Sequence, residues 1–207
     1  MGRATAESRR AHANGNEQQE YAAEQLQAPD RTIFLTGDVS EHSIANVQAM
    51  LLAYAAQNSK PVHMVISTYG GSVDEMFGLY DLIKMLPYPV HTVGLGKVQS
   101  AGVLLMAAGT KGRRLIGANA SIMMHALSGG VQGSVFELEG NVQECKRQQR
   151  LMTSALQDET GMTSTQIKHI MRAGRDYYVT PAEAIKLGIA DRLVGAVKTP
   201  RAAHDDK

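Results

Sequence analysis

The 207-residue sequence is short of cysteine and aromatic residues, with one Cys, three Phe and no Trp, and it has no long apolar run. The lone cysteine, Cys145, excludes a disulfide within the chain and fits a reducing compartment. No stretch approaches the roughly 18 apolar residues of a membrane-spanning helix, and the polar N-terminus lacks the apolar core of a signal peptide. A formal net charge of only +1 gives no reason to expect nucleic acid or an anionic membrane as a partner. These absences predict a cytoplasmic protein.

What is present is the composition of an ordinary globular domain, with 43% apolar and 20% charged residues. The length suits one domain with a sizeable core. We expect this domain at residues 31–195, because residues 1–30 and 196–207 are polar and poor in apolar side chains. Both of these end segments are therefore predicted to be flexible.

Segments rich in β-branched residues alternate with segments of helical periodicity in the first half of the domain. This alternation is typical of a parallel sheet covered by helices, so the predicted fold class is α/β. The strands are expected at 32–36, 62–67 and 90–95, and the helices at 42–57, at about 73–86 and directly after Ser100.

The second half combines short strands with one long helix at about 134–160. The charged faces of this helix exceed what packing against one domain requires, so we expect it to project and to pair with another subunit. The other elements expected here are strands at 113–116, 121–124, 177–179 and 189–194, a helix at 165–172, and a last helix opened by a capping box of Thr180 and Glu183.

Ser100 stands at the predicted turn between a strand and a helix. A hydroxyl in this position faces unpaired backbone N–H groups and the positive end of the helix dipole, which favour a developing negative charge. Such a site suits a nucleophilic serine. A serine that only caps the helix is the alternative.

A histidine and an aspartate are candidates to act with this serine. His125 follows an apolar strand and can reach a serine on a neighbouring turn, where it would serve as general base. Asp176 precedes a strand and a capped helix, and it is the candidate to orient the imidazole. The alternatives are a structural role for His125 and a salt bridge or turn for Asp176, with Arg175 as its partner.

Backbone donors for an oxyanion are expected at two strand-to-helix turns. Gly71 follows one strand and precedes a capped helix, so its N–H can approach a substrate carbonyl without an intervening side chain. Ala101 directly follows the candidate nucleophile. One parallel sheet with right-handed crossovers points both turns the same way. A plain tight turn is the alternative explanation for the glycines.

Five segments in this order together resemble the ClpP family, the proteolytic subunits of Clp proteases. They are IFLTGDV from Ile33, YGGSVDEMFGLYD from Tyr69, QSAG from Gln99 followed by LLMAAGTKGRR, SIMMHALSGGVQG from Ser121, and RDYYVTPAEAIKLGIAD from Arg175.

The resemblance implies a ClpP/crotonase-like α/β fold of stacked β-α units, with residues 134–160 as a handle helix through which two heptameric rings meet. It implies a triad of Ser100, His125 and Asp176 that hydrolyses unfolded polypeptides inside a closed chamber, with oxyanion donors at Gly71 and Ala101. No metal or organic cofactor is expected. An AAA+ Clp unfoldase is the implied partner.

The chain also departs from this family. Aromatic residues are common in the family where this chain has His63 and Val65, at the pockets that receive unfoldase loops, and an acidic residue is usual where it has Gly174.

Other functions remain open. A Ser-Lys peptidase would use Lys97 or Lys111. An α/β-hydrolase does not fit, because it would need a glycine where Val98 stands and the order Ser, acid, His. A crotonase-type acyl-CoA enzyme would need no serine nucleophile. The remaining alternative is a catalytically weak ring subunit with an assembly or modulatory role.

Overall fold

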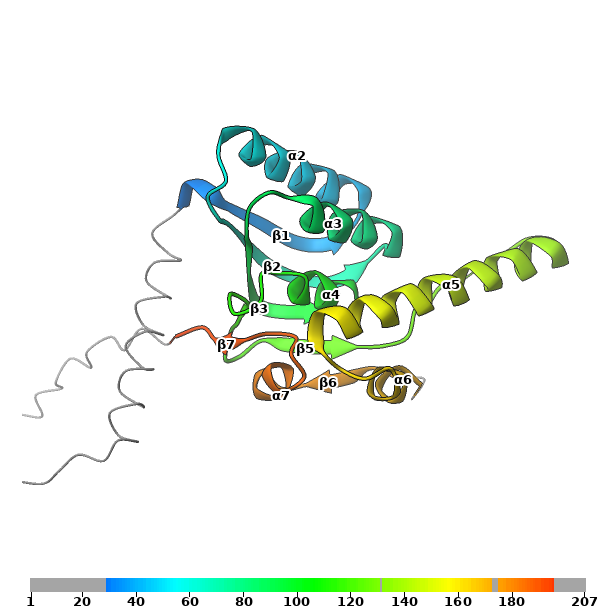
Figure 1. Cartoon of the computed structure of the whole chain (residues 1–207). Coiled ribbons are helices and arrows are strands. Elements are labelled where there is room, and N and C mark those ends of the chain that lie inside the picture. The colour runs from blue at the N-terminus through cyan, green and yellow to red at the C-terminus, as the bar shows by residue number, and fades with distance from the viewer. Residues whose placement is uncertain (1–28, 131, 173–174, 196–207) are drawn as a thin grey trace, which may run out of the picture. The chain divides into compact units, whose positions relative to one another are not determined.

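The computed structural model describes residues 29–130, 132–172 and 175–195. Within them a compact unit spans Arg31–Leu193, and its helices and parallel strands confirm the predicted α/β class (Figure 1). Apart from residues 29 and 30, the predicted end segments lie outside the described residues, and so does Gly174. The domain boundaries therefore stay predictions. In the described part of the chain, no helix is both long enough and apolar enough to cross a membrane.

The elements follow the predicted order. The strands are β1 (Thr32–Val39), β2 (Val62–Gly71), β3 (Val90–Gln99), β4 (Leu115–Ile116), β5 (Ser121–Met124), β6 (Tyr177–Val179) and β7 (Arg192–Leu193). The helices are the 3-10 turn η1 (Pro29–Arg31), α2 (Glu41–Gln57), α3 (Val73–Met85), α4 (Ala101–Ala107), α5 (Val135–Thr160), α6 (Ser164–Arg172) and α7 (Pro181–Lys186).

The described strands form one seven-stranded sheet. Its main path runs β1-β2-β3-β4-β7 with parallel neighbours throughout, and β5 pairs in parallel with the end of β3. Strand β6 is antiparallel to β5, which the sequence did not predict. The parallel part follows from the helical crossovers between strands, whereas β6 is reached by a longer route through α5 and α6.

All three long strands continue further than predicted, to Val39, Gly71 and Gln99, because their glycines bend the chain without ending the strand. Gly37 was expected to stop β1, but it adopts a φ of +84° at a bulge between Thr36 and Asp38, and the strand continues to Val39. Strand β3 likewise passes through Gly96, with a φ of +65°, and ends at Gln99. Conversely, β4 and β7 are only two residues long each, shorter than predicted.

The core lies where α4 packs on β2 and β3 and against α3 and α5. All seven residues of α4 are buried, so this helix has no solvent-exposed face. Each large apolar side chain buried in this way contributes about 1.5–3 kcal/mol to folding. The residues preceding and following α4 are therefore held by a rigid support.

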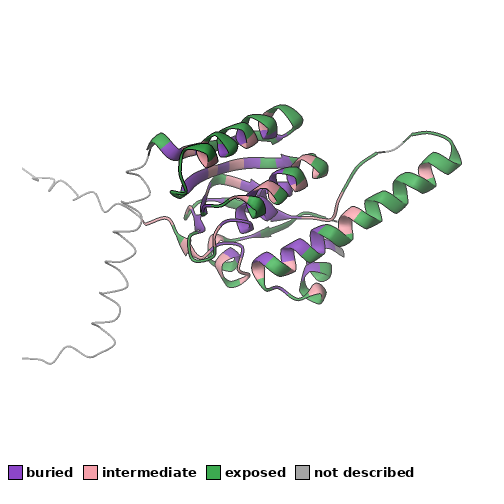
Figure 2. Cartoon of the chain, turned by 45° about the horizontal axis from the view of Figure 1, so that its top comes forward, coloured by how far each residue is buried: buried purple, intermediate pink, exposed green. Residues whose placement is uncertain are grey.

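The long helix α5 projects beyond the sheet, as predicted (Figures 1 and 2). Ser134 and Glu137 close its N-terminus with a reciprocal capping box, and Gly161 ends it in the left-handed conformation. Only its C-terminal part packs on the core. The buried residues are Met152, Thr153, Ala155, Leu156 and Glu159.

Two histidines lie side by side in the sheet, His63 on β2 and His91 on β3. They are paired in register, with ring centroids 5.1 Å apart, and each is 8% exposed. Burial, followed by electrostatic repulsion from His63 and Arg113, lowers the pKa of His91 to about 4. His91 is therefore neutral in the folded protein at neutral pH.

This pKa predicts an acid-sensitive fold. Unfolded His91 takes up a proton below about pH 6.5, whereas folded His91 resists protonation until about pH 4, so the free energy of unfolding should fall across this window by up to about 3 kcal/mol. The variant His91→Gln should lose most of this dependence. Urea denaturation at about pH 7 and about pH 4.5 measures it. Substitution of the exposed His42 by Gln is the control and should keep the wild-type difference in unfolding free energy between the two pH values. The same difference in His91→Gln as in wild type would contradict the prediction.

Candidate active site

Ser100 has a strained backbone at the end of β3. Its φ of 52° and ψ of −119° make it the one non-glycine residue with positive φ among the described residues. Its N–H donates to the carbonyl of Met123 at 2.8 Å, and its carbonyl accepts from Val103 at 3.0 Å. Its side chain makes no capping hydrogen bond to α4. The alternative that this serine only caps the helix is therefore wrong.

The hydroxyl of Ser100 instead meets His125. The Nε2 atom of His125 lies 2.7 Å from Ser100 Oγ, within hydrogen-bond distance. The sheet explains this contact, because Gln99 on β3 is paired with Met123 on β5, and Ser100 and His125 follow these two strands. The histidine side chain is 25% exposed, so one edge of the ring faces solvent.

Asp176 lies on the other side of the His125 ring. Its Oδ1 is 3.9 Å from His125 Nδ1, which is an ion-pair distance but longer than a hydrogen bond. The antiparallel pairing of Met124 with Tyr177 brings the residues before β6 opposite the residue after β5. The Asp176 side chain is 51% exposed. The structure thus brings the three predicted side chains together, with the His–Asp contact still open.

The glycine turn after β2 lies directly against Ser100. A Cβ atom on Gly70 would fall 2.6 Å from Ser100 Cβ and 3.0 Å from the Ala101 nitrogen, and one on Gly71 would fall 2.2 Å from the Val39 carbonyl oxygen. The two strand-to-helix turns therefore meet, as the parallel sheet predicted. A plain tight turn explains the positive φ values of the glycines but not this close approach. Ala101 is the first residue of α4, where an N–H has no acceptor within the helix.

The two lysines considered for a Ser-Lys pair have other contacts. The ammonium of Lys97 lies 4.5 Å from the centre of the Tyr69 ring, and that of Lys111 donates to the carbonyl of Asp158 at 2.8 Å. Ser100 Oγ contacts His125 instead. The geometry therefore favours a histidine as the base.

A glutamine that the sequence pattern did not indicate holds the segment after His125. Gln149 on α5 accepts a hydrogen bond from the Leu127 N–H at 2.8 Å, and its amide nitrogen donates to Met171 Sδ at 2.9 Å. It thereby links the segment after β5 to both α5 and α6. Nothing in the pattern of the polar helix distinguishes this glutamine from its neighbours.

Chemically, a serine hydroxyl bonded to a histidine can attack a carbonyl carbon while the imidazole takes its proton. The N–H of Ala101, at the first position of α4, directly follows the strained turn. A family model described as Clp protease matches residues 15–197, which include Ser100, His125, Asp176 and both turns.

The close approach of the glycine turn predicts unequal costs for two alanine substitutions. Gly112 has a φ of +82°, but a Cβ there meets nothing within 4 Å, so Gly112→Ala should cost only backbone strain of about 1–2 kcal/mol. Gly70→Ala, with a φ of +101°, adds the clash with Ser100 and should cost about 1–3 kcal/mol more. Urea denaturation of the two variants measures the difference. Equal costs would show that Gly70 does not support the serine turn.

Proposed function

Since the chain belongs to the Clp protease family and has its ClpP-like α/β fold, we propose that it is a serine endopeptidase subunit that hydrolyses peptide bonds of unfolded polypeptides in the cytoplasm. The observation that carries this proposal is the 2.7 Å contact between Ser100 Oγ and His125 Nε2. Ser100 is the nucleophile, His125 the general base and Asp176 the residue that orients the base.

The proposed reaction is acyl transfer through a covalent intermediate. Ser100 Oγ attacks the scissile carbonyl carbon as His125 Nε2 takes its proton, and the N–H groups of Gly71 and Ala101 stabilise the oxyanion. The imidazolium then gives the proton to the leaving amine, and water hydrolyses the acyl-enzyme by the reverse sequence. Hydrolysis by these residues requires no ATP, metal or organic cofactor in this mechanism.

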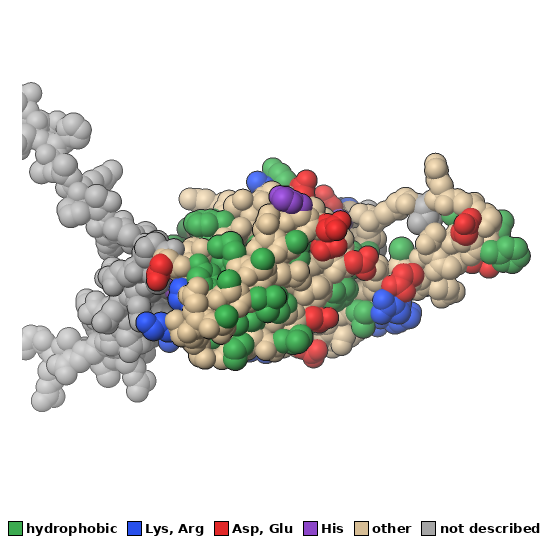
Figure 3. Space-filling view, turned by 90° about the horizontal axis from the view of Figure 1, so that it is seen from above, with side chains coloured by type: hydrophobic (Ala, Val, Ile, Leu, Met, Phe, Trp, Pro, Cys, Tyr) green, Lys and Arg blue, Asp and Glu red, His purple; other side chains and the backbone are tan. Residues whose placement is uncertain are grey.

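The proposed oligomer is a pair of stacked heptameric rings joined through α5. Apolar side chains gather at the outer end of this helix (Figure 3), where Val135 is 67% and Phe136 is 84% exposed. Two further apolar surfaces suit neighbours within a ring. They comprise Leu52 and Met85 on the helical side, and Phe34 and Leu95 on the uncovered side of the sheet, each at least 40% exposed. Contacts between unlike surfaces of identical copies generate rings.

An AAA+ Clp unfoldase remains the proposed partner. Its support is the same uncovered sheet face, where Phe34 is paired with Val65 in register. At the position of His63, the side chain is buried against His91. The surface offered to a partner's loops is therefore formed by Phe34 more than by the histidine.

A catalytically weak ring subunit with an assembly or modulatory role is the second candidate. The 3.9 Å separation of His125 and Asp176 favours it, because an imidazolium without a bonded carboxylate is less stabilised in the transition state. In the first candidate this gap closes by about 1 Å to reach hydrogen-bond distance when substrate or neighbouring subunits bind.

Replacing the nucleophile separates the two candidates. Ser100→Ala should abolish both labelling by a fluorophosphonate probe and cleavage of fluorogenic peptides, while light scattering should give the wild-type particle mass. Ser40→Ala, which removes only the side-chain cap of α2, is the matched control and should keep both activities. Wild-type rings that are neither labelled nor active would favour the assembly role.

Removing the charge of the third residue tests the triad. Asp176→Asn should lower kcat by about 100- to 10,000-fold, because the imidazolium loses its counter-charge and the asparagine amide can hold the wrong tautomer. Steady-state hydrolysis of a fluorogenic peptide measures the change. An unchanged kcat would show that Asp176 has no part in catalysis, which would then depend on Ser100 and His125 alone.

A further inference from the structure

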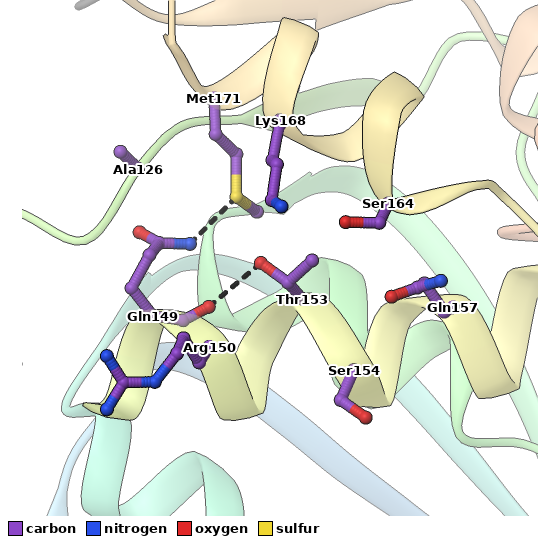
Figure 4. A pocket seen from close by; sticks show the side chains of 9 residues that line it. All are labelled: Ala126, Gln149, Arg150, Thr153, Ser154, Gln157, Ser164, Lys168 and Met171. Atoms are coloured by element: carbon purple, nitrogen blue, oxygen red, sulfur yellow. Dashed lines mark hydrogen bonds between the residues drawn. The ribbon is translucent and has the colours of Figure 1, made fainter. Parts of the chain in front are cut away.

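A pocket of about 350 Å³ lies between α5 and α6, beside the candidate active site (Figure 4). Ala126, which directly follows His125, forms one side of it, and Met171 of α6 forms another. Consecutive Cα atoms are about 3.8 Å apart, so this wall begins one residue from the base that contacts Ser100. The pocket therefore adjoins the segment that directly follows the candidate base.

The pocket carries positive charge without a carboxylate. Arg150 and Lys168 contribute to its lining, and of the described residues that line it none is acidic. The Lys168 side chain extends from α6 toward α5, so its ammonium lies over the space between the helices (Figure 4). In the parts of the chain that the structure covers, this exposed ammonium has no hydrogen bond or ion pair. A ligand carboxylate can therefore be its counter-ion.

Two polar side chains of the pocket, Gln149 and Thr153, are already bonded within the protein. The Gln149 amide holds Leu127 with its oxygen and Met171 with its nitrogen, and the Thr153 hydroxyl donates to the Gln149 carbonyl at 2.9 Å. Met171 and Ala126 contribute apolar walls. The pocket volume exceeds that of any single side chain, so the size of a substrate side chain does not determine whether it binds. The unpaired charge of Lys168 can select for a side chain of opposite charge.

We propose that this pocket is a subsite for an acidic substrate side chain, glutamate above all, within two residues of the scissile bond. Lys168 is the residue that determines this specificity. Two methylene groups of glutamate would lie along the apolar walls while its carboxylate pairs with the ammonium, whereas aspartate has only one methylene to bury there. The proposal rests on the peptidase function above and adds its substrate class.

The test is the distribution of cleavage sites in an unstructured protein digested by the full chain. Mass spectrometry should find glutamate enriched about fivefold or more at one position within two residues of the cut, an effect of the size expected for one solvated ion pair. Lys168→Met should abolish the enrichment, and Lys168→Glu should replace it by Lys and Arg. Lys60→Glu, the same charge change on an exposed loop residue outside the pocket, should keep the wild-type pattern.

A binding measurement keeps the subsite testable without turnover. Fluorescence polarisation with the Ser100→Ala variant should show about fivefold tighter binding of a glutamate peptide than of its glutamine counterpart, and the preference should shrink in high salt. Adding Lys168→Glu should reverse it. Equal binding of the two peptides, or equal cleavage patterns in wild type and Lys168→Glu, would overturn the subsite. Absence of fluorophosphonate labelling would instead contradict the peptidase function.

Discussion

The left-handed backbone of Ser100 is the constraint around which this chain is arranged. A non-glycine residue in such a conformation costs about 1–3 kcal/mol, and it persists only where its surroundings determine it. Here the Ser100 N–H donates to the Met123 carbonyl of β5, and the helix that follows Ser100 is buried on every side. Gly70 packs so closely against Ser100 that a Cβ on Gly70 would clash with it. The strain directs the hydroxyl away from the helix end and toward His125. The parallel sheet, the apolar helix α4 and the two glycines thus all hold Ser100 in this conformation.

An ion pair of low exposure links the helix that follows Ser100 to the projecting helix α5. Arg114 donates to Asp191 at 2.7 Å and to the carbonyls of Ala107, the last residue of α4, and of Glu159, in the last turn of α5. Burial alone raises the pKa of Asp191, but the hydrogen bonds and charge of Arg114 outweigh it, so this pKa lies below its usual value. Breaking such a pair would leave a buried charge uncompensated. The C-terminal turn of α5 and the C-terminus of α4 are therefore held by the same side chain, Arg114.

Much of this arrangement could be predicted from local chemistry. The alternation of β-branched and helical segments determines a parallel sheet, and the residues that follow its strands, Ser100 and His125, then meet at one edge. The antiparallel β6 could not be predicted, because a three-residue strand contains no signal for direction. The open His125–Asp176 contact depends on sub-ångström placement of a half-exposed side chain. The role of Gln149 depends on which face of α5 meets α6, which the polar pattern of that helix conceals.

The position of Gln149 has a mechanical consequence. One wall of the pocket belongs to α5 and the opposite wall to α6, and the segment after His125 hangs from α5 through this one amide. Arg114 holds the Glu159 end of α5, so a tilt of the opposite end would pivot about Glu159. A displacement of the outer end of the helix would therefore change the gap between the pocket walls and move the segment beside the base. In the proposed oligomer, a subunit contact at the outer end of α5 would therefore also affect the position of the segment beside His125.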